Sequence, residues 1–212
     1  MSCCQCQGVE QMFDDKNARK ELKSYHKKGA SKTTQLLVNA VRELGDGSST
    51  LLDVGGGVGA IQHALLKNGF EKATHADASS AYLTVSKQEA ERQGTEDRVD
   101  YRFGNFVEIA PEIKTHDVVT LDRVICCFDD MPALVRSSAE RAEKLYGVVY
   151  PRDRKSTRIA AKLGNFFLKL LRKPFRGFIH KTEDVEAILR ELGFQRKFHK
   201  NLFIWQVAVF AK

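Results

Sequence analysis

A short apolar run that leads into a cluster of glycines constrains the fold of this chain more than any other feature. The run Thr50–Val54 has the composition of a buried strand, and the turn Gly55–Gly59 that follows contains four glycines. From Ala60 onward the apolar residues take helical spacing. Because glycine lets the backbone turn sharply and approach a ligand closely, the pattern predicts a strand, a tight turn and a helix with a nucleotide-like cofactor at the turn.

The carboxylate of Asp53 discriminates between classes of cofactor. The spacing Gly55-x-Gly57-x-x-Ala60 fits the dinucleotide fingerprint, and Asp77 follows at about 20 residues, where a ribose-binding acid is expected. A dinucleotide would place its doubly negative pyrophosphate on this turn, where an unscreened Asp53 would oppose it at low dielectric. S-adenosylmethionine instead carries an ammonium and a sulfonium, so an acid at the strand end favours its binding.

Composition fits one compact globular domain in the cytoplasm. The chain has 212 residues, of which 42% are hydrophobic. It contains no apolar run of about 18 residues, and its polar start is unlike a secretory signal. The five cysteines are Cys3, Cys4, Cys6, Cys126 and Cys127. Neither cluster resembles a disulfide framework or the paired spacing of a structural zinc site, so we expect reduced thiols and no metal.

The positive charge is concentrated in one segment, residues 151–178. This segment has nine Lys or Arg and one Asp, a net charge of +8 against +7 for the whole chain. Residues 158–173 within it have the spacing of an amphipathic helix, with the apolar positions Ile159, Leu163, Phe166, Phe167, Leu170 and Leu171. Three interpretations are open: a helix packed on the sheet with a solvated basic face, a lid over an apolar acceptor, or an interfacial helix touching anionic lipid.

The order of elements predicts an α/β protein. Further strands are expected at 73–77, 99–103, 116–128 (with the exit of the strand), 145–150, 194–198 and 202–210. Helical patterns separate the first five strands, and the last two form a hairpin. We therefore expect a three-layer αβα, Rossmann-like fold with a seven-stranded sheet, mostly parallel, whose last strand is antiparallel. Residues 1–45 form an N-terminal helical cap, and residues 46–212 form the domain, with the basic insert 151–178.

The spelling Asp53-x-Gly55-x-Gly57-x-Gly59 resembles motif I of class I S-adenosylmethionine-dependent methyltransferases. Later segments follow the same family in order over residues 46–212. The basic insert, followed by Phe175–His180, is loosely similar to magnesium-protoporphyrin O-methyltransferases, whose acceptor is a flat apolar ring bearing carboxylates.

This resemblance implies a set of cofactor-binding residues. Asp77 lies at the end of the second strand, where it can accept both ribose hydroxyls, or else act as the first acid of a helix. Asn105 replaces the acid that bonds the adenine amino group in the family, and Phe106 either stacks on adenine or fills the core. The predicted set is Asp53, Gly55, Gly57, Gly59, Asp77, Ala78, Asn105, Phe106, Leu121 and Asp122, with the last two beside the methionine part of the cofactor.

The cap and the exit of the fourth strand are expected to shape the acceptor side. Tyr25 and residues 28–30 are expected to face the site, and Ile125–Phe128 to form the acceptor wall. No catalytic residue is assigned, because methyl transfer needs a base only when the acceptor is protonated. The candidates are His180, Tyr150 and Asp122.

The predicted function is therefore an S-adenosylmethionine-dependent methyltransferase acting on a small or medium acceptor that is apolar and can carry acidic groups. One alternative is a nicotinamide-dependent oxidoreductase, which Asp53 disfavours. Another is an RNA-binding or RNA-modifying protein that uses the basic insert, although no RNA-binding motif accompanies the charge. We expect a small-molecule partner, no nucleic acid, and no stable membrane insertion beyond weak peripheral contact.

Overall fold

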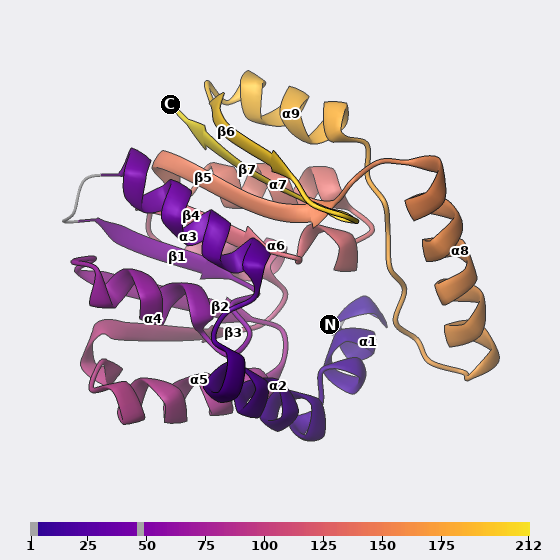
Figure 1. Ribbon diagram of the computed structural model, residues 1–212, viewed down its shortest axis with the longest axis horizontal. Coiled ribbons are helices and arrows are strands. Elements are labelled where there is room, and N and C mark those ends of the chain that lie inside the picture. The colour runs from indigo at the N-terminus through magenta and orange to yellow at the C-terminus, as the bar shows by residue number, and fades with distance from the viewer. Residues whose placement is uncertain (1–3, 46–48) are drawn as a thin grey trace.

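The structure is a computed structural model that describes residues 4–45 and 49–212. Its centre is a seven-stranded sheet in the order β3-β2-β1-β4-β5-β7-β6 (Figure 1). The strands are β1 (Thr50–Val54), β2 (Lys72–Asp77), β3 (Val99–Phe103), β4 (His116–Asp122), β5 (Ala142–Pro151), β6 (Gln195–Asn201) and β7 (Trp205–Ala211). β7 is antiparallel to both neighbours, whereas β1 to β5 pair in parallel, which confirms the predicted fold class.

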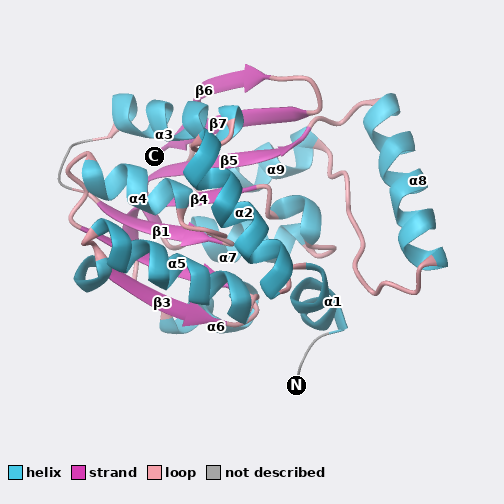
Figure 2. Ribbon diagram, turned by 60° about the horizontal axis from the view of Figure 1, so that its bottom comes forward, coloured by secondary structure: helices cyan, strands magenta, loops and turns pink. Residues whose placement is uncertain are grey.

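Helices cover both faces of the sheet. The described helices are α1 (Cys4–Met12), α2 (Asp15–Lys28), α3 (Lys32–Leu44), α4 (Ala60–Lys67), α5 (Ser80–Gln93), α6 (Phe106–Ile109), α7 (Met131–Ala139), α8 (Lys155–Leu170) and α9 (Thr182–Glu191). Short 3-10 turns add η1 (Glu96–Arg98), η2 (Ala110–Glu112) and η3 (Ile125–Cys127). α3, α4 and α5 lie on one face, and α6, α7 and α9 lie on the other (Figures 1 and 2).

The central strands are apolar at consecutive positions because both of their faces are buried. Leu51 packs in the core under α3 and α4, whereas Leu52 packs in the core under α6, α7 and α9. Val118 and Val119 on β4 divide in the same way. Because successive side chains of a strand point to opposite faces of the sheet, each of these two pairs of neighbours places one side chain in each core.

Several helix boundaries follow from capping residues. Ser79 accepts a hydrogen bond from the N–H of Tyr82 and so caps α5, and Asp130 caps α7 through the N–H of Ala133. Gly94 ends α5 in the left-handed conformation, at φ 66°. α9 begins at Thr182, whose hydroxyl accepts from Gln206.

α8 stands away from the sheet (Figure 1), and none of its residues is buried. Of the three interpretations of this helix, packing of its apolar face on the sheet is therefore wrong. The returning segment 171–181 runs between α8 and the body of the molecule and occupies the place that the helix would need. This segment bonds to η3, where the N–H of Phe178 donates to the carbonyl of Cys126 at 2.8 Å. Among the described helices, none combines the length and apolar composition needed to cross a bilayer.

Candidate functional site

The glycine-rich turn lies where the order of the sheet reverses. β1 pairs with β2 on one side and with β4 on the other, and α4, which follows β1, lies on the opposite face of the sheet from α7, which follows β4. In open α/β sheets this point, at the carboxyl ends of the strands, is where ligands bind. A cavity of about 330 Å³ lies there, between the ends of β1, β2 and β4 and the N-terminal helices α1 and α2.

Seven of the ten predicted cofactor residues line this cavity. They are Gly55, Gly57, Asp77, Ala78, Asn105, Phe106 and Asp122. The structure therefore brings together residues from four separate strand ends. Asp53, Gly59 and Leu121 lie elsewhere and are described below.

Two glycines of the turn have different roles. Gly57 has φ 59° and borders the cavity, where an added Cβ would meet only the Tyr82 ring, at 3.6 Å. Gly59 has φ 79°, but an added Cβ there would come within 2.7 Å of His63 Nε2 and Ser86 Oγ. Gly59 does not line the cavity, so its small size serves the packing of α4 on α5.

The carboxylate of Asp77 holds the turn in place. Its Oδ2 accepts from the N–H of Gly57 at 3.1 Å, and its Oδ1 accepts from the N–H of Ser79 at 2.8 Å. Burial raises the pKa of Asp77 to about 6, although these two backbone donors act against the rise. The carboxylate still has lone pairs that a hydroxyl in the cavity could use.

Asp53 lies behind the turn. Its Oδ1 accepts from Thr120 Oγ1 at 2.8 Å, while its Oδ2 has no hydrogen-bond partner within the described residues. Burial, with a smaller contribution from the nearby carboxylates of Asp122 and Asp77, raises the pKa of Asp53 to about 8. Asp53 lines a smaller adjoining cavity of about 60 Å³. Asp53 was predicted to contact the cofactor directly. In the structure it lies underneath the glycine-rich turn instead.

Asp122 and Arg123 form a pair at the end of β4. Asp122 Oδ2 accepts from Thr34 Oγ1 at 2.5 Å, and its Oδ1 accepts from Arg123 Nε at 3.0 Å. Arg123 has φ 63°, in the left-handed region that residues with a Cβ rarely adopt. Its guanidinium lies 6.0 Å from the centre of the Trp205 ring. Such strain is typical of functional sites, and both residues line the cavity.

Asn105 and Phe106 lie at the far end of the cavity. Asn105 Oδ1 accepts from the N–H of Val107 at 3.2 Å and so caps α6, which leaves one lone pair for a further donor. Phe106 is part of the core and also borders the cavity. Leu121, by contrast, is fully buried in the core and does not border the cavity, so its expected contact with the methionine part is not seen.

Of the three catalytic candidates, only Asp122 lines the cavity. His180 Nε2 donates to the carbonyls of Ile125 (3.1 Å) and Phe128 (2.8 Å), which ties the returning segment to η3. Tyr150 is buried in the core, and this burial raises the pKa of its hydroxyl. His180 and Tyr150 therefore have structural roles.

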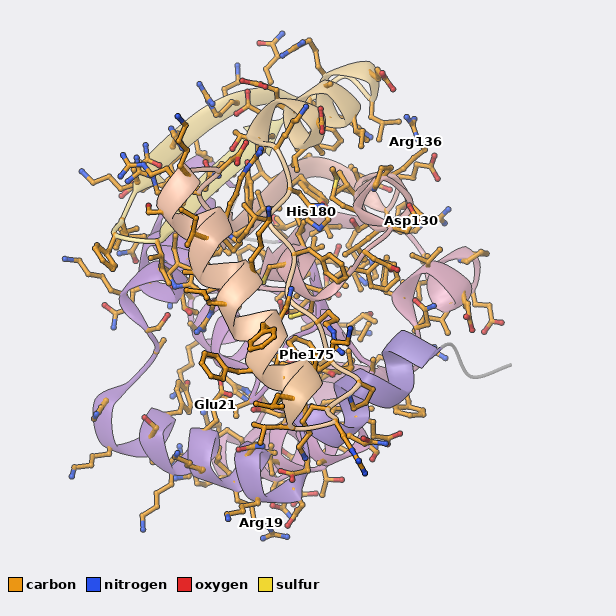
Figure 3. The ribbon with its side chains drawn as sticks, turned by 90° about the vertical axis from the view of Figure 1, so that its right-hand side faces the viewer. Arg19, Glu21, Asp130, Arg136, Phe175 and His180 are labelled. Atoms are coloured by element: carbon orange, nitrogen blue, oxygen red, sulfur yellow. The ribbon has the colours of Figure 1, made fainter. Side chains whose placement is uncertain are left out.

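The N-terminal helices contribute different residues from those expected. Val9, Phe13 and Glu21 line the cavity, whereas Tyr25 and residues 28–30 do not. Figure 3 shows Glu21 and Arg19 on opposite sides of α2, with Glu21 toward the cavity. The sequence feature that could have located this helix is Asp14. Its side chain caps α2 by accepting from the N–H of Asn17, and this fixes where the helix begins.

The wall opposite the turn is mostly apolar. It is formed by Cys126, Cys127, Phe128, Leu134 and Trp205. This set includes three residues of the stretch 125–128 that was expected to form the acceptor wall. Ile125 itself is buried beneath it.

The N-terminal cysteine cluster falls outside the described side chains: Cys3 lies outside the described residues, and Cys4 and Cys6 are described only as part of the α1 backbone. Within the described residues, no group of His, Cys, Asp and Glu is arranged to hold a metal ion.

Comparison with known proteins identifies the class. Residues 52–147 match a family model described as "Methyltransferase domain". No curated protein matches the sequence. Magnesium protoporphyrin IX methyltransferase from Synechocystis PCC 6803, solved with bound SAH, is 16% identical, with a TM-score of 0.70 over 85% of this chain and 82% of that chain. The same enzyme with bound SAM is 15% identical, with a TM-score of 0.66 over 92% and 83%.

A third structure is similar over part of its length. An O-methyltransferase family protein from Burkholderia thailandensis is 16% identical, with a TM-score of 0.73 over 96% of this chain but 62% of that chain, so this chain spans less than two thirds of that relative. At such low sequence identities the structures show a shared fold alone. The family match shows which class of domain residues 52–147 form. Residues 52–147 are thus a methyltransferase domain within a chain of methyltransferase fold, which confirms the predicted class of S-adenosylmethionine-dependent methyltransferase.

Proposed function

We propose that this protein binds S-adenosylmethionine in the 330 Å³ cavity and transfers its methyl group to a small or medium apolar acceptor, one that can carry acidic groups. One observation carries the proposal: three neighbouring strands, β1, β2 and β4, each carry an aspartate as their last or second-last residue, at the glycine-rich turn. These are Asp53, Asp77 and Asp122. Glu21 adds a fourth acid at the edge of the cavity.

The charges and the hydrogen-bonding groups fit this cofactor. A sulfonium and an ammonium would offset the mutual repulsion of the carboxylates, whereas a pyrophosphate would add to it. Asp77 would hold the ribose, and Asn105 with Phe106 would bind adenine. Asp122 would receive the methionine part. Asp53, with an orphaned Oδ2 beneath the turn and a raised pKa in the free protein, would become negatively charged when a cationic cofactor binds nearby.

The bound cofactor supplies an activated methyl group, and the protein supplies alignment. Fixing donor and acceptor in one geometry can lower a barrier by about 7 to 11 kcal/mol relative to the reaction in solution. The apolar wall formed by Phe128, Leu134 and Trp205 would hold the acceptor and exclude water. Among the described residues that line the cavity, Arg123 is the cationic one, and it would orient an acceptor carboxylate.

A methyl-transfer assay tests the acceptor class. The protein would be incubated with methyl-labelled S-adenosylmethionine and a panel of acceptors: apolar aromatic acids, their neutral amides, polar metabolites, magnesium protoporphyrin and total RNA. We expect label in apolar acceptors, with the acids preferred over the amides. Arg123→Gln should remove the preference for acids while leaving the amides as acceptors. Label confined to RNA or to polar metabolites would contradict the proposal.

A further inference from the structure

α8 presents an apolar surface to solvent. The side chains on this surface are 55 to 70% exposed: Ile159, Leu163, Phe166, Phe167, Leu170 and, just after the helix, Leu171. Within the described residues, most of the exposed large hydrophobic side chains lie on this helix and its end. A contiguous exposed apolar patch of this kind marks an interaction site.

This surface points away from the cavity. The α8 residues that the rest of the chain partly covers are Thr157, Ala161, Asn165 and Leu168, whose spacing places them along one side of the helix. Asn165 fixes that side, because its Nδ2 donates to the Gly177 carbonyl at 2.7 Å and its Oδ1 accepts from the Gly177 N–H at 2.8 Å. At about 100° per residue, the centre of the apolar stripe lies roughly opposite this side. A lid would require α8 to roll over and break both bonds.

A row of lysines borders the apolar surface. Lys155, Lys162 and Lys169 follow one another along the same flank of the helix, Lys173 follows after its end, and all four are exposed. Within the described part of the chain, none of them has an ion-pair partner, in contrast to Arg158, which pairs with Asp153. The basic charge of the flank is therefore available to an anionic partner.

A second apolar projection lies beside the start of α8. The turn between β6 and β7 carries Phe203, which is 92% exposed, and Ile204, which is 41% exposed. The N–H of Arg152 donates to the Ile204 carbonyl at 2.9 Å, which ties the turn to the residues that lead into α8. Figures 1 and 2 both show this turn on the α8 side of the molecule.

We propose that α8, together with the β6–β7 turn, is a docking surface for an anionic phospholipid bilayer. The apolar stripe would lie in the boundary between headgroups and acyl chains, with the helix axis in the membrane plane, and the lysine row would contact the headgroup phosphates. The charge pattern favours lipid, because one continuous basic flank beside an apolar stripe matches a uniformly anionic surface. The length of about 24 Å for sixteen residues suits a helix lying on the membrane.

Flotation with the full chain tests this proposal, using vesicles of phosphatidylcholine alone and of phosphatidylcholine with about 30% phosphatidylserine. We expect binding to the anionic vesicles to be at least about tenfold stronger than to the neutral ones, and to be lost at high salt. Phe166→Ala with Phe167→Ala should weaken binding by about tenfold or more, and Lys162→Glu with Lys169→Glu should act similarly.

Matched controls separate a local effect from a general one. Phe103→Ala removes a phenylalanine of similar exposure, 56%, on β3. Lys67→Glu with Lys114→Glu makes the same charge change at the opposite ends of the strands, where both lysines are exposed. Both controls should float as the wild type does. Unchanged melting temperatures would show that the α8 variants are folded.

Three results would overturn the proposal. The wild type could fail to float with anionic vesicles, or the α8 variants could float as well as the wild type. Alternatively, the wild type could fail to bind vesicles and instead form a dimer that Phe166→Ala with Phe167→Ala abolishes. That result would show that the surface mediates self-association.

Discussion

Asp77 connects the glycine-rich turn to the cavity through one carboxylate. Its Oδ2 fixes the N–H of Gly57, and the same group faces the space assigned to the ribose. Asp77→Ala should weaken S-adenosylmethionine binding by about 1.5 to 3 kcal/mol, the range for a hydrogen bond to a charged group. Equilibrium titration of the folded variant measures the loss. Asp77→Asn is the control, because it retains one acceptor and should lose less; wild-type affinity in both variants would reduce Asp77 to a helix-capping acid.

Asp53 should make the stability of the free protein depend on pH. Its pKa is raised from 3.8 to about 8, so the folded state holds a proton that the unfolded state has released over this interval. Its contribution to stability is therefore full below about pH 4 and is lost as the pH rises toward 8. Asp53→Asn removes this titration, so its melting temperature should fall less than that of the wild type between pH 5 and pH 8. Parallel pH profiles for the two proteins would contradict the assignment.

At the scale of elements, the turn between β1 and α4 offers a matched pair of substitutions. Gly57 and Gly59 have similar positive φ angles, so alanine at either position adds a similar backbone strain of about 1 to 2 kcal/mol. Gly57→Ala should mainly weaken cofactor binding, because its Cβ meets open cavity. Gly59→Ala should cost more stability, because its Cβ meets His63 and Ser86.

Thermal unfolding and cofactor titration of both glycine variants check this difference. Equal losses of stability would show that the contacts at Gly59 relax without cost. Unchanged cofactor affinity in folded Gly57→Ala would remove the turn from the binding site.

Periodicity predicted most elements but not what each one contacts. The 3.6-residue pattern of α8 indicated a helix with one apolar face, and it could not tell whether a sheet, a ligand or solvent covers that face. The segment 171–181, which lies between α8 and the sheet, keeps the apolar face from reaching the sheet. Its path depends on hydrogen bonds to the backbone of η3, and such bonds do not produce a recognisable sequence pattern. The segment 1–45 was predicted to be helical, but the separate bounds of α1 and α2 were not predicted. Ala18 is the buried residue of α2, so the apolar stripe that would mark this helix in the sequence is weak.

At the scale of the whole molecule, the order of strands and helices was sufficient to predict the fold. Parallel strands joined by helices have one favoured handedness, so the β-α order leaves few topologies, and the glycine-rich turn then falls at the switch point. The same reasoning predicts that Asp77, Asn105 and Asp122 meet at one edge of the sheet, and all three line the cavity. Leu121 was misplaced because neighbouring strand residues alternate in direction, and a motif does not say which of two faces the cavity.

The cavity as a whole gathers acidic side chains, while the insert 151–178 has a net charge of +8 against +7 for the whole chain. This separation predicts that cofactor binding depends on the acids and is independent of α8. The lipid-facing variants Phe166→Ala with Phe167→Ala should therefore bind S-adenosylmethionine as the wild type does.

The central claim is that the cavity selects a cationic cofactor over a pyrophosphate. Calorimetric titration of the wild-type protein with S-adenosylmethionine, S-adenosylhomocysteine and NAD, at one pH and salt concentration, tests this most directly. We predict saturable binding of S-adenosylmethionine and S-adenosylhomocysteine at one site per chain, with NAD bound at least about a hundredfold more weakly, equivalent to about 2.7 kcal/mol. NAD binding tighter than that of S-adenosylmethionine would contradict the account.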